Sequence, residues 1–331
     1  MIRSEASRRR AVAVLKMLGV AAAYYASGRI GLLRQVSVEG SVVSPLWPPT
    51  GIALAALLCL GLRIWPGIAL GVLLTVTSLS HGLALSGLGM AAGSTLAPVC
   101  SYLALRAVGF REELDRLRDG VVLVFLGAMG GMLISATSGA GVLLLTGDLP
   151  GSSFWSVWSA WWAGDAMGVL MVTPLLLVLR NARVPRLNDP WMEATGLAVV
   201  AVGITIVATR SSLSMIYLLF PVIIWAALRF QLAGSAPCAL LMSVMAIVAG
   251  TDQVGPFANH TVLEVMLNLS ILNGCVALTA LLLAAIVTEH NNIRYETELA
   301  CEELATLVEE LAPQQARKDR AAELRNGQGS A

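Results

Sequence analysis

Charged residues are scarce in this chain. Asp, Glu, Lys and Arg make up 13% of its 331 residues, whereas 56% are hydrophobic. Soluble domains carry roughly a quarter charged residues, so this composition excludes an ordinary soluble domain. The net charge of +1 is divided among separate segments and forms no pooled basic surface for nucleic acid. We therefore expect an integral membrane protein that binds no nucleic acid.

The sequence also lacks the common motifs of enzymes and metal sites. Its five cysteines are scattered without a CxxC pair, so we expect small packing residues and no disulfide framework or metal site. It has no GxSxG, HExxH or P-loop motif and no Gly-rich dinucleotide turn between a strand and a helix. We expect no enzymatic activity, no cofactor and no metal ion.

Long apolar segments are what the sequence does contain. Most are close to the ~20 residues that a helix needs to cross the hydrocarbon core. Their ranges are 11–25, 46–62, 64–80, 83–105, 121–145, 155–179, 192–209, 213–228, 232–250 and 262–288. The expected fold is an all-α, polytopic bundle of about ten transmembrane helices. Because several segments are short or broken by Gly and Pro, eight spans is the alternative.

Basic residues are distributed unevenly over the connections. With a cytoplasmic N-terminus, most arginines lie on inner connections, whereas the outer connections 147–154 and 251–261 contain no Lys or Arg. Cytoplasmic loops of membrane proteins are enriched in these residues. We therefore expect both termini in the cytoplasm, a basic N-terminal segment at 1–10, and a lipid-embedded domain at 11–288.

The composition changes after residue 288. A cytoplasmic helix or short coiled coil is expected at 289–312, with an apolar seam that could form a homodimer. The seam residues are Ile293, Ala300, Leu304, Leu307 and Leu311. Pro313 ends the pattern, and the polar segment 313–331 is expected to be disordered. This tail leaves no room for a folded catalytic domain.

Two irregular clusters lie at outer ends of the expected spans. The first is PLWPPTG, residues 45–51, where Pro48 and Pro49 suit a helix entry and Trp47 suits the interface. Another is TDQVGPFANH, residues 251–260, whose Gly-Pro-Phe indicates a tight turn with an aromatic plug. Taken alone, the first cluster could be a rigid helix start and the other a capping turn. Because both are expected on the same side of the membrane, a pocket is favoured.

A third cluster, with Asp165 and four tryptophans, lies in the span at 155–179. Asp165 is ten residues beyond Trp155, hence ~15 Å deeper in a regular helix. Trp158, Trp162 and Asp165 are expected to share one helix face. An acid inside a span is by default a candidate functional residue. Helix packing is the alternative role.

These clusters resemble the bacterial membrane-associated sensor domains of the MASE type-one group. The resemblance covers about residues 11–290 and rests on motifs in the same order and spacing. They are SPLWPPTGIALAALL (44–58), RIWPGIALG (63–71), GFREELDRLRD (109–119), WWAGDAMGVLMVTPLLL (161–177), LRF (228–230), GPF (255–257) and AAIVTEH (284–290). Where the family often has Asn, this chain has Thr77 or Ser78, and Ser94.

The resemblance implies an integral-membrane input module of the bacterial inner membrane. Such modules usually precede histidine kinase or diguanylate cyclase domains, so a separate kinase or cyclase is the implied partner, or else the chain is a truncation. The implied ligand-binding or signalling residues are Trp47, Pro48, Pro49, Gly51, Trp161, Trp162, Gly164, Asp165, Pro174, Arg229, Gly255, Pro256 and Phe257.

Three functions fit these observations. The first is a sensor that binds an unidentified small ligand, or senses a membrane state, on the outer side and relays it through the last span. The second is a proton-coupled transporter or transporter subunit built around the mid-membrane acid Asp165. The third is an anchor that recruits partners through its acidic tail. Proton-dependent uptake of a labelled solute would favour transport over sensing.

Overall fold

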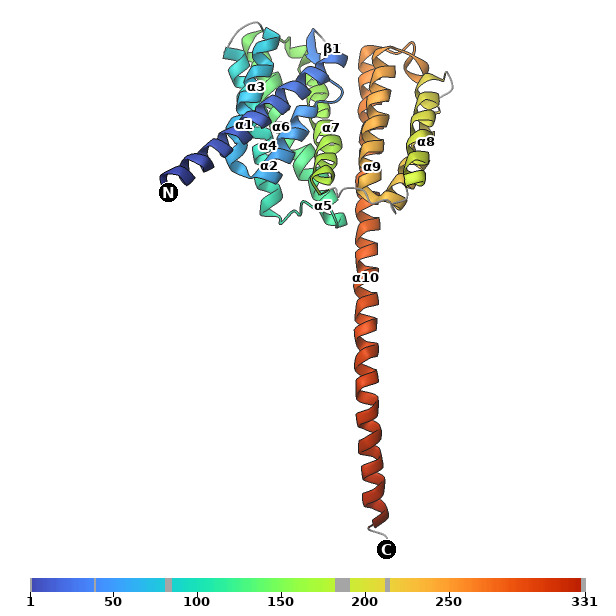
Figure 1. Ribbon diagram of the computed structural model, residues 1–331. Coiled ribbons are helices and arrows are strands. Elements are labelled where there is room, and N and C mark those ends of the chain that lie inside the picture. Colours follow the sequence, from blue (N-terminus) through green and yellow to red (C-terminus); the bar gives the residue numbers. More distant parts are fainter. Residues whose placement is uncertain (1, 39, 81–84, 182–190, 212–214, 329–331) are drawn as a thin grey trace. The chain divides into compact units, whose positions relative to one another are not determined.

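The computed structural model describes residues 2–38, 40–80, 85–181, 191–211 and 215–328. The chain forms two units, Met1–Ile286 and Val287–Ala331. The first unit consists of helices and one small β-hairpin (Figure 1).

Helices dominate the described part of the chain. Its α-helices are α1 (Ile2–Gly31), α2 (Pro48–Leu60), α3 (Trp65–Ser80), α4 (Leu85–Ala107), α5 (Leu117–Val122), α6 (Gly131–Thr146), α7 (Phe154–Asn181), α8 (Trp191–Arg210), α9 (Leu219–Thr251) and α10 (Val262–Gln328). A π-helix, η3 (Leu123–Gly130), joins α5 to α6. Five single turns of 3-10 helix are η1 (Leu32–Arg34), η2 (Leu62–Ile64), η4 (Gly151–Ser153), η5 (Ile216–Leu218) and η6 (Gly255–Phe257).

The expected all-α polytopic fold is confirmed. In the described residues, eight helical stretches are long and apolar enough to cross a membrane, which equals the alternative count. α2 is shorter, at 13 residues, or ~20 Å, and α9 contains two segments. When α2 and the two segments of α9 are counted separately, the described residues contain ten apolar helical segments.

The division of α9 is seen in contacts of the chain with the two ends of α8. Nε of Arg229 lies 2.7 Å from both carboxylate oxygens of Glu193, at the start of α8. Gly255, just beyond α9, instead packs against the carbonyl of Thr209 at the end of α8. Gln231 has non-helical φ and ψ of 51° and −140°. The chain therefore reverses at Gln231, between the spans that the sequence separates.

Glycines bring α2 and α7 into backbone contact. A Cβ on Gly168 would lie 1.9 Å from the carbonyl oxygen of Trp47, and one on Gly51 would lie 2.1 Å from that of Gly168. Gly164 has no room either, because its Cβ would lie 2.2 Å from the carbonyl oxygen of Ser44. Small residues at such crossings let membrane helices pack closely. The motifs WPPTG and WWAGDAMG therefore form one helix crossing.

Hydrogen bonds fix the register of this crossing. The amide of Trp47 donates to the carbonyl of Gly164 over 3.0 Å. The hydroxyl of Thr50 donates to the carbonyl of Asp165, and that of Thr173 to the carbonyl of Gly51, each over 3.0 Å. Pro48 and Pro49 occupy the first positions of α2, where a missing N–H removes no helical bond.

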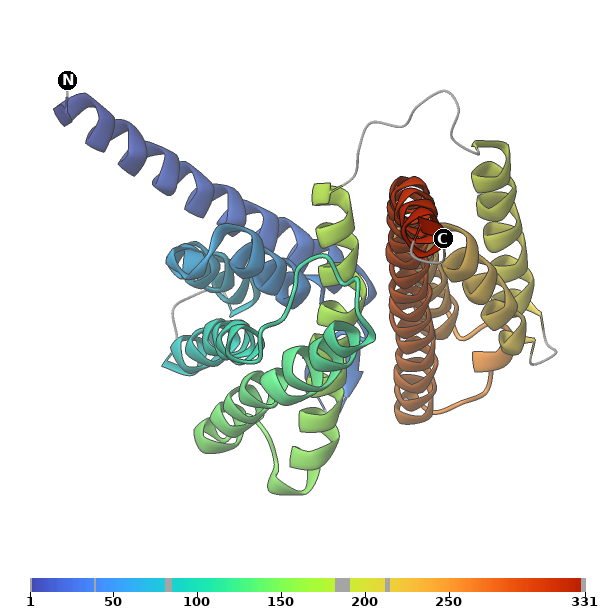
Figure 2. The ribbon, with the colours of Figure 1, turned by 90° about the horizontal axis from the view of Figure 1, so that it is seen from below.

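α7 lies between α1–α6 and the segments of α8–α10 that belong to the first unit (Figures 1 and 2). It contacts α2 and α6 on one side and α9 on the other. The hydroxyl of Ser243 in α9 lies 3.7 Å from the sulfur of Met171. α7, which carries the third cluster, therefore contacts both groups of helices.

Two elements differ from expectation. The strands β1 (Val36–Val38) and β2 (Ser41–Val43) pair as an antiparallel hairpin between the first two expected spans, where the expected all-α fold has no strand. α10 continues through Pro313 to Gln328, where we expected a disordered tail. The Ala, Gln, Lys, Arg and Glu residues after Pro313 are strong helix formers, which offsets the bond that a proline removes.

The glycine crossing predicts a sharp contrast between two substitutions. Gly168→Ala overpacks the contact with Trp47 and should destabilise the protein by about 1–3 kcal/mol. Gly203→Ala is the matched control, since a Cβ there meets nothing within 4 Å. Thermal unfolding in lipid nanodiscs measures both. Equal unfolding temperatures for the two variants would contradict the assigned contact.

Candidate ligand cavity

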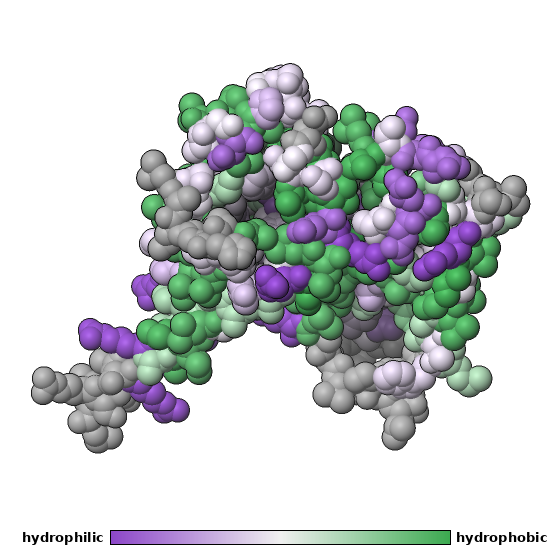
Figure 3. Space-filling view, turned by 90° about the horizontal axis from the view of Figure 1, so that it is seen from above, coloured by the Kyte–Doolittle hydropathy of each residue, from purple (hydrophilic) through white to green (hydrophobic). Residues whose placement is uncertain are grey.

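A cavity of about 420 Å³ opens near the β-hairpin, between α1, α3, α4, α6, α7 and Trp47, the residue before α2. Its walls are largely apolar, with Leu32, Val42, Val43, Val72, Val76, Leu79, Met90 and Leu143. Polar or aromatic groups come from Tyr24, Ser44, Trp47, Thr75, Ser86, Ser94, Asp148, Trp161 and Asp165. Figure 3 looks onto this end of the unit and shows a hollow beside apolar side chains. Its volume is in the usual range of small-molecule sites.

Asp165 lies in the wall of this cavity and is 1% exposed. Its Oδ2 is buried and accepts no hydrogen bond from the described residues. None of their ion pairs includes Asp165 either. The side chains of Ser135 and Trp161 face the carboxyl group. Burying a carboxylate without a cation costs free energy. No described residue of the protein supplies a cation that would offset this cost for Asp165.

Aromatic side chains surround the same space. Tyr24 of α1 is 1% exposed, and the indole of Trp47 is placed to hydrogen-bond its hydroxyl. Trp161 lies one helical turn before Asp165, and both line the cavity. The helix crossing therefore brings Trp47 of the first cluster to Trp161, Gly164 and Asp165 of the third.

Trp162 has a different position from the expected one. It does not line the cavity; its indole N–H donates to the carbonyl of Met129 over 2.8 Å. Its ring stacks on Trp158, with centroids 6.1 Å apart. Met129 belongs to the π-helix η3, whose wider turns leave carbonyls to be satisfied by other groups. Trp158, Trp162 and Asp165 were expected on one face, but Trp162 contacts η3 whereas Asp165 lines the cavity.

The Gly-Pro-Phe cluster lies outside the cavity lining. Gly255 has φ of +59°, and a Cβ there would lie 2.3 Å from the carbonyl oxygen of Thr209. Pro256 follows within the η6 turn, and Phe257 is 1% exposed. This is the expected tight turn with an aromatic plug, but it packs on α8 and α9. The three clusters do not converge on one space.

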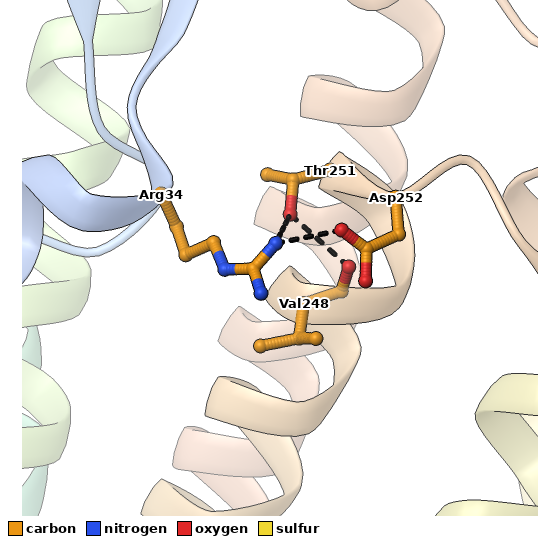
Figure 4. A network of polar contacts seen from close by, with 4 residues as sticks. All are labelled: Arg34, Val248, Thr251 and Asp252. Carbon is orange, nitrogen blue, oxygen red and sulfur yellow. Dashed lines mark hydrogen bonds and ion pairs between the residues drawn. The ribbon is translucent and has the colours of Figure 1, made fainter.

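One ion pair links the end of α1 to the end of α9 (Figure 4). Nη1 of Arg34, beside the cavity residue Leu32, lies 2.6 Å from Oδ1 of Asp252 and 3.3 Å from Oγ1 of Thr251. The Thr251 hydroxyl also donates to the carbonyl of Val248. Both charged side chains are more than a third exposed, so the pair is worth only about 0–1 kcal/mol. It can open and close at little cost.

Two other expected site residues lie away from the cavity lining. Pro174 is buried within α7 and lies near Leu232 and Ala236 of α9. Arg229 pairs with Glu193 beside the Gln231 reversal. Their positions indicate roles in helix shape and in the turn.

Sequence reasoning missed several residues of the site. Tyr24 and Ser135 look like ordinary span residues, and only the fold brings them to Asp165. Thr50 and Gly168 were also missed. A usable signal existed for Gly168, since Gly164 and Gly168 form a small-xxx-small pair in a span.

The fold and cavity define a class: a polytopic helical membrane protein with a small-molecule-sized cavity at one end of its bundle. The comparisons with known proteins give the family. The MASE1 model matches residues 17–291, and the chain belongs to this family of membrane-associated sensor domains. MASE1 is an input domain and not a catalytic one.

A relative supports the same assignment. The chain is 29% identical over 211 residues to the "Probable diguanylate cyclase DgcE" of Escherichia coli (strain K12). The match covers 59% of this chain and 18% of the relative, so the chain spans less than a fifth of that protein's length. No solved structure matches the chain.

The environment of Asp165 predicts that removing its charge stabilises the protein. Asp165→Asn keeps the shape and removes the cost of an unpaired buried carboxylate, so we expect a gain of about 1 kcal/mol or more. Asp148→Asn, at an exposed position of the cavity rim, should change stability by less than about 0.5 kcal/mol. Thermal unfolding at neutral pH in nanodiscs measures both. A marked destabilisation by Asp165→Asn would show a partner for the carboxylate.

Proposed function

We propose that the chain is a sensory input module that binds a small ligand in the cavity and relays its occupancy to the cytoplasm. The observation that carries the proposal is Asp165, a buried acid with an unpartnered oxygen in the wall of a cavity. Unfavourable groups of this kind persist where function requires them. In this proposal the cavity end of the bundle is extracytoplasmic, and both termini are cytoplasmic.

The proposed relay runs from the cavity through η1 to α9 and then to α10. Arg34 lies two residues after the cavity residue Leu32, in the same η1 turn, and binds Asp252 at the end of α9. α9 in turn packs on α10, where the hydroxyl of Ser235 donates to the carbonyl of Ala280 over 3.0 Å. A ligand that moves η1 would change this contact and the balance between two arrangements of α9 and α10.

The second unit supplies the proposed output surface. Ile293, Leu304 and Leu307 are 56%, 61% and 52% exposed. They belong to the apolar seam that the sequence predicts on this helix, together with Ala300, and such a seam fits a homodimer or the helix of a partner. The relative's printed name is a probable diguanylate cyclase. We propose a diguanylate cyclase or a histidine kinase as the output, either as a separate partner or on the same polypeptide.

A reporter fusion tests the sensor role without knowledge of the ligand. The chain is fused after α10 to a diguanylate cyclase domain, and cellular cyclic di-GMP is measured at matched membrane abundance. Asp165→Asn and the cavity-filling Ser94→Phe should each shift output at least about fivefold, the usual lower range of allosteric coupling. Gly203→Ala should leave output unchanged. Equal output from all four proteins would refute a sensing role for the cavity.

The Arg34–Asp252 pair can be tested by charge exchange. Arg34→Glu and Asp252→Arg should each shift the output of the same fusion, because each leaves like charges facing one another. The double variant restores opposite charges and should return output toward that of the original chain. If the double variant merely adds the two single effects, the contact is not part of the relay. The exposed pair Arg294 and Glu298, exchanged in the same way, is the control.

A further inference from the structure

We infer that the ligand of the cavity is a small organic cation, an ammonium group on an apolar body. This inference rests on the proposed sensor function and adds the chemical class of its ligand. Three independent features of the cavity carry it: the sign of its charges, its aromatic groups and its apolar walls.

The charges of the cavity have one sign. Asp165 lies deep in the wall and Asp148 lies at the exposed rim, and no Lys, Arg or His occurs among the described lining residues. The arginine that follows the cavity residue Leu32 is Arg34, which is bound to Asp252. An anion would have to leave water and face two carboxylates without a donor of positive charge. A phosphate, carboxylate or sulfate ligand is therefore disfavoured.

Asp165 has the geometry of an incomplete ion pair. Its Oδ2 is buried and accepts no hydrogen bond from the described residues, and Asp165 is one of the residues that line the cavity. An ammonium group there would donate to Oδ2 and neutralise the buried charge. A charge-assisted bond of this kind is roughly twice as strong as one between neutral groups. The ligand would thus supply the hydrogen-bond donor and the positive charge that Oδ2 of Asp165 lacks among the described residues.

Aromatic groups provide the remaining contacts for a cation. The side chains of Tyr24, Trp47 and Trp161 come from three helix segments and line the same cavity as Asp165. Indole and phenol faces attract ammonium groups, more strongly when water is excluded. Val72 and Val76 of α3 belong to the apolar wall that would bind the ligand body. A small inorganic ion would leave this wall and most of the 420 Å³ unused.

A matched series of probes tests the class of ligand. The full chain in nanodiscs is titrated with 2-phenylethylammonium, 2-phenylethanol and 3-phenylpropanoate, which share one apolar body and differ in charge. Calorimetry with empty nanodiscs as blank should show saturable binding of the cation, at least tenfold tighter than either other probe. Asp165→Asn should reduce cation binding to the level of the alcohol. Glu264→Gln, an exposed acid outside the cavity lining, should leave it unchanged.

A second variant covers the case in which Asp165→Asn does not insert. Ser94→Phe narrows the cavity while the carboxylate remains, and it should abolish binding of the cation. Tighter or equal binding of the alcohol or the anion, or no binding of any probe, would overturn the cationic ligand. If the reporter fusion still depends on Asp165 in that case, the sensor function stands and only the ligand class fails. If the fusion also ignores Asp165, both fail.

Discussion

The backbone contact between α2 and α7 is the constraint on which the site depends. Gly51, Gly164 and Gly168 let the entry of α2 lie directly on α7. Because no Cβ intervenes, Trp47 at the start of α2 comes to the same wall as Asp165. The two most unusual motifs of the sequence are thus the two sides of one crossing. Their glycines allow the close backbone contact, and Trp47, Trp161 and Asp165 of the same motifs line the cavity.

The crossing also explains how a costly residue is retained. Asp165 cannot turn away from the bundle, since its own carbonyl receives the Thr50 hydroxyl and its helix is fixed on both sides. A buried acid without a cation lowers the stability of the free protein. That same deficit gives a ligand free energy to recover on binding. In the proposed relay, the exposed pair of Arg34 with Asp252 would connect the cavity with α9, because small differences shift a two-state equilibrium.

Much of the fold could be predicted because a membrane span is recognised from the composition of a continuous stretch of residues. Apolar length, proline at a helix entry and the turn at Gly255 are local properties, and all appear where they were expected. The hairpin at Val36–Val43 was missed, since its two strands of three residues each are too short to show alternation. The site was predicted only in part. Helical spacing placed Trp162 on the face of Asp165, but Trp162 packs against η3, and the cavity is lined instead by Trp161, which only the resemblance implied.

The sequence by itself determined the membrane class, the order of the spans and the three irregular clusters, since each depends on residues adjacent in the chain. It also singled out Asp165, because an acid in an apolar run is exceptional whatever surrounds it. Only the tertiary structure decided which clusters meet. Trp47 lies near Asp165, whereas Gly255 packs on α8. These contacts depend on how the surfaces of helices far apart in the sequence fit together. Asp165, conspicuous in the sequence, became in the fold an acid with one oxygen left free in the wall of a cavity.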